Sequence, residues 1–124
     1  MAYVPRRGDI VLVGFPFTDL AAVKVRPAVV VSPAPYHAAT ADVLLAAVSS
    51  VVPARRLLPT EILVRNDRPG FASTGLKRTS LVLCGKLFAA ERRLLLRRLG
   101  RIEAEDLTRL DAGLAAAVGV GRWR

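Results

Sequence analysis

Two apolar stretches of this sequence carry, at their ends, residues that can bind phosphate. Arg26 comes directly before the apolar run at 27–32, and Ser49 and Ser50 end another run at 42–49. If these neighbouring strand ends meet, a guanidinium and a hydroxyl share one cleft. Such a pair could bind a scissile phosphate and offset the charge that grows on its oxygens. A structural interpretation stays open, because arginine at strand starts and serine at strand ends are common.

Two further side chains could carry chemistry, and each also has a plain structural interpretation. His37, the single histidine, could act as a general base, but a lone histidine in a loop is more often a surface side chain. Cys84 lies inside the apolar segment 80–88 and is predicted to be a core thiol. One thiol and one histidine cannot build a structural zinc site, and no paired carboxylates or phosphate-binding glycine motif stand out. We expect neither a metal nor a cofactor.

The charge of the chain favours a polyanionic partner. Nineteen Lys and Arg residues against ten Asp and Glu give a formal net charge of +9. Residues 1–102 hold sixteen basic and six acidic residues, a net of +10, whereas residues 103–124 hold three and four. The basic field therefore belongs to the N-terminal body, as expected for a surface that meets phosphates. A GC-rich genome, which enriches arginine and alanine together, is the alternative explanation.

Apolar runs of strand length predict a mainly β chain. We expect strands at 9–15, 27–32, 42–49, 60–65, 80–88 and 94–102. The run at 42–49 is apolar on all sides, which predicts a buried central strand. Loops are predicted at 15–25 and 66–79, where turn-forming residues cluster, and at 33–40, with room for one helical turn.

From Glu103 onwards the pattern becomes helical. Apolar residues share one side of the predicted helix at Leu107, Leu110, Leu114, Ala117 and Val118. Acidic residues fill the first turn, where the helix dipole favours anions, and Gly119 can end the helix. Short strands followed by one helix suggest a small curled β-barrel with the helix packed across it.

The length of 124 residues and the 52% apolar content fit one domain spanning 1–124. A core of this size is marginal, so burial of one face in a homodimer would add stability. No apolar run is long enough to span a membrane. Cys84 has no partner for an intramolecular disulfide, which fits a reducing compartment, and we expect a cytoplasmic protein.

An ordered set of motifs carries a family resemblance. The segment RGDIVLVGFPFTD, followed by KVRPAVVVSP, resembles the opening signature of the MazF/PemK-like toxins. The later LLAAVSS is similar to the family strand that ends in a catalytic Thr or Ser. The segment GLKRTSLVLCGKLFAAERRLLLRRLGRI, with the helix after it, resembles the C-terminal half of the family. The match runs over nearly the whole chain.

The resemblance implies an SH3-like curled barrel with a C-terminal helix, the fold that MazF and CcdB toxins share. It also implies the toxin of a type II toxin–antitoxin system, a homodimer restrained by an acidic antitoxin. The implied activity is metal-independent, sequence-selective cleavage of single-stranded RNA through attack by its own 2′-hydroxyl. The catalytic arginine would be Arg26, as proton donor or charge stabiliser. The catalytic hydroxyl would be Ser49, with Ser50 as the alternative in register, and no general base is identified.

The resemblance also points to RNA-binding residues. The loop before Arg26 contributes to RNA binding in relatives, which implicates Phe17, Thr18, Asp19 and Lys24. Candidate phosphate contacts in later loops are Ser50, Arg55, Arg56, Lys77 and Arg78. For Phe17 the structural alternative is a core side chain, and for the cations it is a solvated basic loop.

Two other functions fit parts of the sequence. A gyrase poison of the CcdB kind shares the barrel but acts by binding, and Trp123 near the C-terminus fits that idea loosely. The Arg-Pro motif and the later hydroxyl favour the nuclease, because the poison requires neither. A catalytically silent nucleic-acid-binding barrel is supported by the charge alone.

Overall fold

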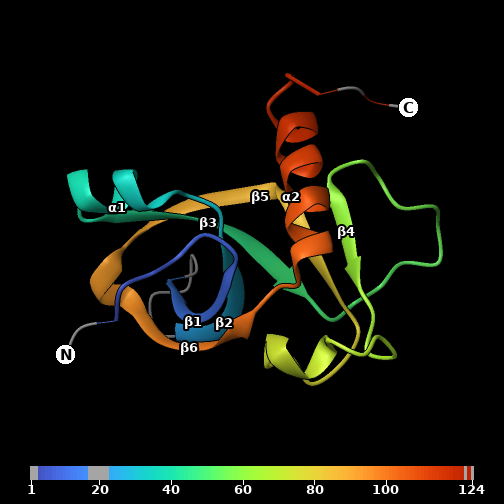
Figure 1. The fold of residues 1–124 in the computed structure, drawn as a ribbon, viewed down its shortest axis with the longest axis horizontal. Coiled ribbons are helices and arrows are strands. Elements are labelled where there is room, and N and C mark those ends of the chain that lie inside the picture. The colour runs from blue at the N-terminus through green and yellow to red at the C-terminus, as the bar shows by residue number, and fades with distance from the viewer. Residues whose placement is uncertain (1–2, 17–22, 122, 124) are drawn as a thin grey trace.

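The computed structural model describes residues 3–16, 23–121 and 123, and the strands in this part of the chain form one six-stranded antiparallel sheet (Figure 1). The strand order is β4-β5-β3-β2-β1-β6. The strands are β1 Asp9–Pro16, β2 Val23–Val30, β3 Asp42–Ser49, β4 Glu61–Val64, β5 Ser80–Glu91 and β6 Leu95–Arg101. Every strand predicted from the sequence is present, so the mainly β prediction is confirmed.

The sheet curls strongly but, within the described residues, does not close into a barrel. Its two edges are β4 and β6. The register shifts between Ala46 and Ala47 where β3 meets β5, and at two points where β1 meets β6. Such irregularities increase local twist and bend a sheet. The result is an open, barrel-like curl in which β1, β2 and β6 lie together at one end (Figure 1).

Both faces of the central strands are buried. Ile10 and Val29 belong to one apolar cluster with Leu110 of the C-terminal helix, whereas Val11 and Val30 belong to a second cluster on the other face. Adjacent strand residues point to opposite faces, so a continuous apolar run supplies both clusters at once. In β3, Val48 belongs to the first cluster and Val43 to the second, which confirms a central strand buried on both faces, except that Leu44 is 38% exposed.

The C-terminal helix, α2 Ala104–Ala117, packs across β4 and β5 (Figure 1). A Cβ at Gly113 would lie 2.9 Å from the sulfur of Cys84, so the helix approaches β5 closely at this point. Gly119, with φ of +83°, ends the helix as predicted. The N–H groups of Gly119 and Val120 donate to the carbonyls of Ala116 and Ala115, which satisfies the last turn.

Shorter helices occupy two of the predicted loops. The helix α1, Ala34–Ala39, lies within 33–40, and the 3₁₀ turn η1, Phe71–Thr74, lies within 66–79. A second 3₁₀ turn, η2 Arg92–Leu94, joins β5 to β6. In the described part of the chain, no helix is long and apolar enough to cross a membrane.

The predicted start of the second strand at residue 27 was wrong. β2 begins at Val23, because its pairing with β1 runs from Ile10–Val29 to Pro16–Val23. Tertiary pairing thus extends the strand through Pro27, a residue that sequence rules place at strand ends. The predicted loop 15–25 is correspondingly too long, and Arg26 lies within the strand rather than before it.

Candidate active site

The predicted catalytic residues lie where the pairing of β2 with β3 ends. The last paired residues are Ala28 and Ala47, and Arg26 and Ser49 each lie two residues further along their strands. Side chains two apart on a strand share a face, as do cross-strand partners. The register therefore places Arg26 and Ser49 on one face, at the same end of the two strands. Pro27 has no N–H to donate, which fits the end of the ladder at this point.

An open pocket of about 470 Å³ lies at this end of the strands. Arg26 and Ser50 both line it, so the structure brings the predicted arginine together with one of the two candidate hydroxyls. The lining comes from several elements: Leu12, Arg26, Pro27, Val48, Ser50, Gly75, Leu76, Lys77, Arg78, Ser80, Arg97 and Leu99. The pocket therefore combines cations and hydroxyls with an apolar wall.

The two serines are placed differently. Ser50 is exposed and lines the pocket. Ser49 is half-buried and is not among the lining residues; its hydroxyl accepts a hydrogen bond of 3.1 Å from the N–H of Val51. That bond orients the Ser49 oxygen as the chain leaves β3. Arg26 thus shares a pocket with Ser50 and a strand face with Ser49.

The pocket holds an uncompensated positive charge. Its cations are Arg26, Lys77, Arg78 and Arg97, all exposed, and its described lining includes no Asp or Glu. None of the four forms an ion pair with a described residue, whereas eight other arginines do. Clefts lined by one sign of charge attract counter-charged ligands. The pocket is therefore suited to a polyanion.

Sequence reasoning missed Arg97. It lies on β6 opposite Leu12 of β1, and this pairing brings it to the pocket. The segment 94–102 is basic in sequence. The register of β6 against β1 decides which of two neighbouring arginines faces the pocket: Arg97 lines it, whereas Arg98 pairs with Asp9. Alternation within the strand was the one sequence signal available.

The remaining predicted RNA contacts are spread around the site. Phe17, Thr18 and Asp19 lie outside the described residues. Lys24 is exposed on β2, on the same strand face as Arg26, but does not line the pocket. Lys77 and Arg78 do line it, in the segment after η1.

Arg55 and Arg56, in the loop between β3 and β4, do not line the pocket either. Arg55 makes two hydrogen bonds of 2.8 Å to the carboxylate of Glu61, which also accepts one from the N–H of Leu58. These bonds lower the pKa of Glu61 to about 2, with the Arg55 contact as the largest cause. Arg55 thus links the loop between β3 and β4 to the start of β4, whereas Arg56 is exposed and has no ion-pair partner among the described side chains.

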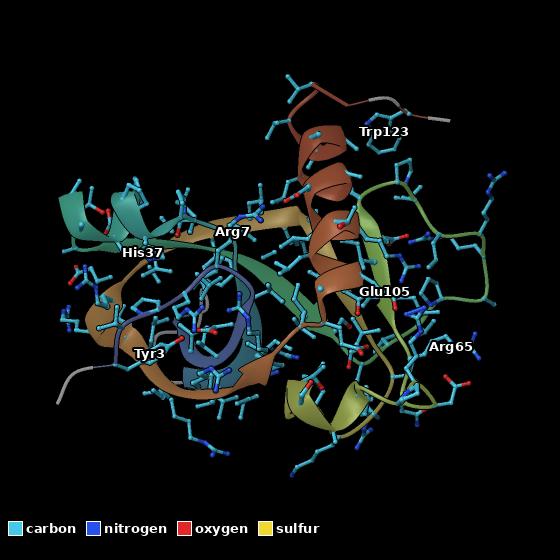
Figure 2. All side chains as sticks on the ribbon, viewed as in Figure 1. Tyr3, Arg7, His37, Arg65, Glu105 and Trp123 are labelled. Carbon is cyan, nitrogen blue, oxygen red and sulfur yellow. The ribbon has the colours of Figure 1, made fainter. Side chains whose placement is uncertain are left out.

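The expectation that His37 lies on the surface was wrong. His37 belongs to α1 and is buried (Figure 2), with Nδ1 at 3.1 Å from the carbonyl oxygen of Pro5 and Nε2 at 2.5 Å from the Ser32 hydroxyl. Ser32 accepts the N–H of Leu44, so its proton is free to point at Nε2. Both ring nitrogens are used inside the fold, so His37 is a structural residue away from the pocket.

Cys84 is confirmed as a core thiol. It is fully buried, and burial raises its pKa to about 11. A thiol with this pKa holds little thiolate at neutral pH, and thiolate is the reactive form.

Asp9, from the Gly-Asp start of β1, ties β6 to the N-terminal segment. Its buried carboxylate accepts hydrogen bonds from Tyr3, from the N–H of Arg6, and from Arg98 and Arg101 of β6. Burial alone would raise the pKa of Asp9, but these four bonds together hold it below its usual value. Tyr3, labelled in Figure 2, also packs against the second apolar cluster.

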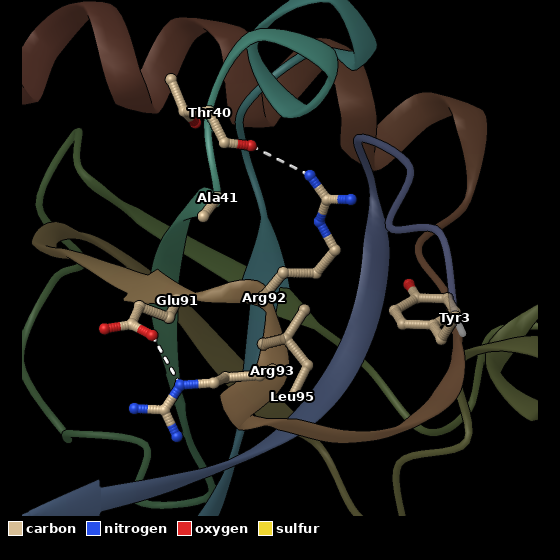
Figure 3. A pocket seen from close by; sticks show the side chains of 7 residues that line it. All are labelled: Tyr3, Thr40, Ala41, Glu91, Arg92, Arg93 and Leu95. Atoms are coloured by element: carbon tan, nitrogen blue, oxygen red, sulfur yellow. Dashed lines mark hydrogen bonds and ion pairs between the residues drawn. The ribbon is translucent and has the colours of Figure 1, made fainter.

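A second pocket, of about 660 Å³, opens near the η2 turn and includes none of the predicted site residues (Figure 3). Both arginines that line it already have hydrogen-bond or ion-pair partners within the chain. Arg92 donates to the carbonyl oxygens of His37 and Thr40, and Arg93 pairs with Glu91 at 2.6 Å. Of the predicted site residues, Arg26, Ser50, Lys77 and Arg78 line the other pocket.

Comparison with known proteins identifies a matching family and several solved structures of similar fold. Residues 6–118 match the family model described as PemK-like, MazF-like toxin of type II toxin–antitoxin system. The chain resembles a MazE–MazF structure from Deinococcus radiodurans with 26% identity and a TM-score of 0.73, covering 96% of this chain and 100% of that one. No curated protein matches in sequence.

Two mycobacterial structures share the fold at lower identity. An endoribonuclease in complex with its cognate antitoxin, from a mycobacterial species, is 19% identical with a TM-score of 0.75, and 96% of this chain and 99% of that one are covered. The Mycobacterium tuberculosis toxin MazF-mt6 is also 19% identical, with a TM-score of 0.71 and coverage of 92% and 99%.

Proposed function

Because the chain belongs to the PemK-like, MazF-like toxins of type II toxin–antitoxin systems, we propose that it cleaves single-stranded RNA where the pairing of β2 with β3 ends. The observation that carries this proposal is the pocket that Arg26 and Ser50 both line, together with cations that pair with no described acidic residue. Phosphodiester cleavage needs a group that binds the phosphate and one that offsets the charge of its transition state. Solved relatives named as endoribonucleases share the fold.

The proposed reaction uses the nucleophile that RNA itself supplies. The 2′-hydroxyl loses its proton and attacks the adjacent phosphorus, the bond to the 5′-oxygen breaks, and that oxygen takes up a proton. The products are a 2′,3′-cyclic phosphate and a 5′-hydroxyl end. DNA lacks the 2′-hydroxyl and is not a substrate.

Arg26 and Ser49 have separate roles in this proposal. The guanidinium of Arg26 binds two non-bridging oxygens of the pentacoordinate phosphate, a geometry that a planar fork suits. The Ser49 hydroxyl, held by the Val51 N–H and on the same strand face as Arg26, binds a phosphate oxygen. Ser50, which lines the pocket, contacts the neighbouring part of the strand. No described side chain is assigned as the general base.

We further propose that the toxin works in the cytoplasm as a homodimer and that an acidic antitoxin segment restrains it. The unpaired cations of the pocket suit an acidic peptide as well as they suit RNA. The solved relatives include a MazE–MazF structure and an endoribonuclease with its cognate antitoxin. A two-fold axis would join two basic faces into one longer surface.

Incubation of the purified chain with single-stranded RNA in the presence of EDTA tests the activity. Cleavage with cyclic phosphate ends is expected, and DNA of the same sequence should stay intact. The Arg26→Ala variant, purified identically, controls for contaminating nuclease. Intact RNA, or equal cleavage by the variant, would refute the proposal and favour a binding module such as a gyrase poison or a silent nucleic-acid-binding barrel.

A further inference from the structure

One wall of the pocket is formed by an edge strand and by the segment after η1, which lies against it. Arg97 projects from β6, and Lys77 and Arg78 follow the η1 turn. All three are exposed, and none forms an ion pair with a described residue. They come from parts of the chain about twenty residues apart, yet they line the same pocket as Arg26.

Two glycines set the spacing between these elements. A Cβ on Gly75 would lie 2.2 Å from the carbonyl oxygen of Leu99, and a Cβ on Gly100 would lie 2.3 Å from that of Ser73. No side chain fits at either position, so the backbone of the η1 segment rests directly on the backbone of β6. Gly75 also has φ of +73°, a conformation that favours glycine. This backbone contact holds the segment that carries Lys77 and Arg78 close to the strand that carries Arg97.

Part of the pocket lining is apolar and includes Leu12, Leu76 and Leu99. A nucleic acid strand presents phosphates separated by sugars and bases, and a base has an apolar face that packs on such side chains. A free inorganic anion would use the cations but not the apolar wall. The combination therefore favours a polynucleotide over a small anion.

We propose that Arg97, with Lys77 and Arg78, forms a second phosphate subsite that holds a phosphate of the RNA strand next to the one bound at Arg26. This inference rests on the proposed function, because it takes the same strand as ligand. Arg97 is a positioning residue: it holds the strand so that the scissile linkage lies at Arg26, and it does not touch the reacting phosphate.

Binding at several salt concentrations tests the subsite without any need for catalysis. The probe is a short labelled single-stranded RNA of mixed sequence made of 2′-O-methyl nucleotides, which cannot undergo 2′-hydroxyl attack. Each phosphate contact to a single strand contributes about 0.7 to the slope of log affinity against log salt. Arg97→Gln should weaken binding several-fold and reduce the slope by about that amount. Arg97→Lys should keep the slope.

Arg93→Gln is the matched control. Arg93 is an exposed arginine four residues earlier, pairs with Glu91 and lines the other pocket. The Arg93→Gln substitution lowers the net charge of the chain by the same amount as Arg97→Gln. An effect seen only with Arg97→Gln would therefore come from a local contact with the RNA and not from the change in net charge. On cleavable RNA, Arg97→Gln should raise KM and leave kcat near the wild-type value, as expected when a residue positions the strand without entering the reaction.

The outcomes separate this inference from the proposed function. Equal slopes for Arg97→Gln, Arg93→Gln and wild type would overturn the subsite, even if the wild type cuts RNA. A slope that depends on Arg97 would support the subsite, even if the wild type binds RNA without cutting it, in which case the nuclease proposal fails alone. A wild type that does not bind the probe would overturn the subsite.

Discussion

The guanidinium of Arg98 donates a hydrogen bond of 3.2 Å to the buried carboxylate of Asp9. This contact, together with that of Arg101, fastens the edge strand β6 to the beginning of β1. Arg97 lies next to Arg98 and projects to the opposite face. The position of a proposed RNA contact thus depends on a buried charge that does not itself meet RNA.

Replacement of Asp9 with Asn should destabilise the fold. The amide of the new asparagine can still accept a hydrogen bond from Tyr3, but Arg98 and Arg101 lose the negative charge that they pair with. We therefore expect the free energy of unfolding to fall by about 2–3 kcal/mol. Urea denaturation measures it. Asp67→Asn, which breaks an exposed pair with Arg65, should change the free energy of unfolding by less than about 1 kcal/mol. Equal losses for the two variants would contradict the role assigned to Asp9.

The same carboxylate should make stability depend on acidity. The pKa of Asp9 is lower in the folded state than its ordinary 3.8. The ionised carboxylate therefore makes its full contribution to the free energy of unfolding above pH 3.8, and that contribution is lost as pH falls through the folded pKa. Glu61, with a pKa of about 2 against an ordinary 4.5, acts in the same direction. Denaturation between neutral and acid pH should show a steeper loss for the wild type than for Asp9→Asn.

Replacement of Arg26 with Ala should abolish RNA cleavage and leave the fold intact. Arg26 is exposed, so its removal opens no cavity in either core. Loss of one donor that stabilises transition-state charge costs on the order of 10²–10³ in rate. Lysine should rescue poorly, because a point charge does not reproduce the bidentate fork. Initial rates on a labelled RNA measure both variants, and near wild-type cutting by Arg26→Ala would contradict the proposed site.

The two serines give a direct test of register. Ser49→Ala should reduce kcat strongly, whereas Ser50→Ala should act mainly on KM, because Ser49 shares the strand face of Arg26 and Ser50 lines the adjoining pocket. Ser49→Thr should stay active, since it keeps the hydroxyl. Single-turnover rates separate the two effects. A dead Ser50→Ala with an active Ser49→Ala would move the catalytic hydroxyl by one residue.

The oligomeric state should be a dimer at micromolar concentration. The described chain exposes large apolar side chains, including Leu96 at 58% and Val51 at 76%, which a partner copy could cover. Light scattering measures the mass in solution. A stable monomer that still cleaves RNA would show that the dimer is not needed for activity.

An acidic antitoxin segment and RNA should compete for the toxin. Both are expected to bind the cations of the pocket, and both affinities should fall as salt rises, RNA more steeply through counterion release. A competition titration with the 2′-O-methyl RNA measures the displacement. Simultaneous binding of both ligands would show that the antitoxin does not occlude the pocket.

Local pattern was sufficient for much of the fold. The alternation and apolar runs placed each strand within a few residues, and the spacing of apolar residues with Gly119 placed α2 and its end. These features depend on residues close in sequence. Arg26 was proposed as catalytic from its place next to an apolar run and from the Arg-Pro motif of the family, whereas its place inside β2 required the pairing with β1.

Contacts between distant segments could not be predicted in this way. The burial of His37 depends on Pro5 and Ser32, and the pairing of Arg55 depends on Glu61 across a loop. Arg97 reaches the pocket through a register that shifts twice along β1 and β6. Each of these outcomes is decided by how the sheet curls, which the sequence pattern alone does not specify.

Because α2 packs closely on β5, the reactivity of a buried thiol between them can report local opening of the fold. Cys84 is the single thiol of the sequence, and Gly113 of the helix lies against its sulfur. A thiol reagent can reach this atom only after the helix lifts from the sheet or the whole fold opens. The rate of labelling therefore measures that opening, in the native protein and without an engineered probe.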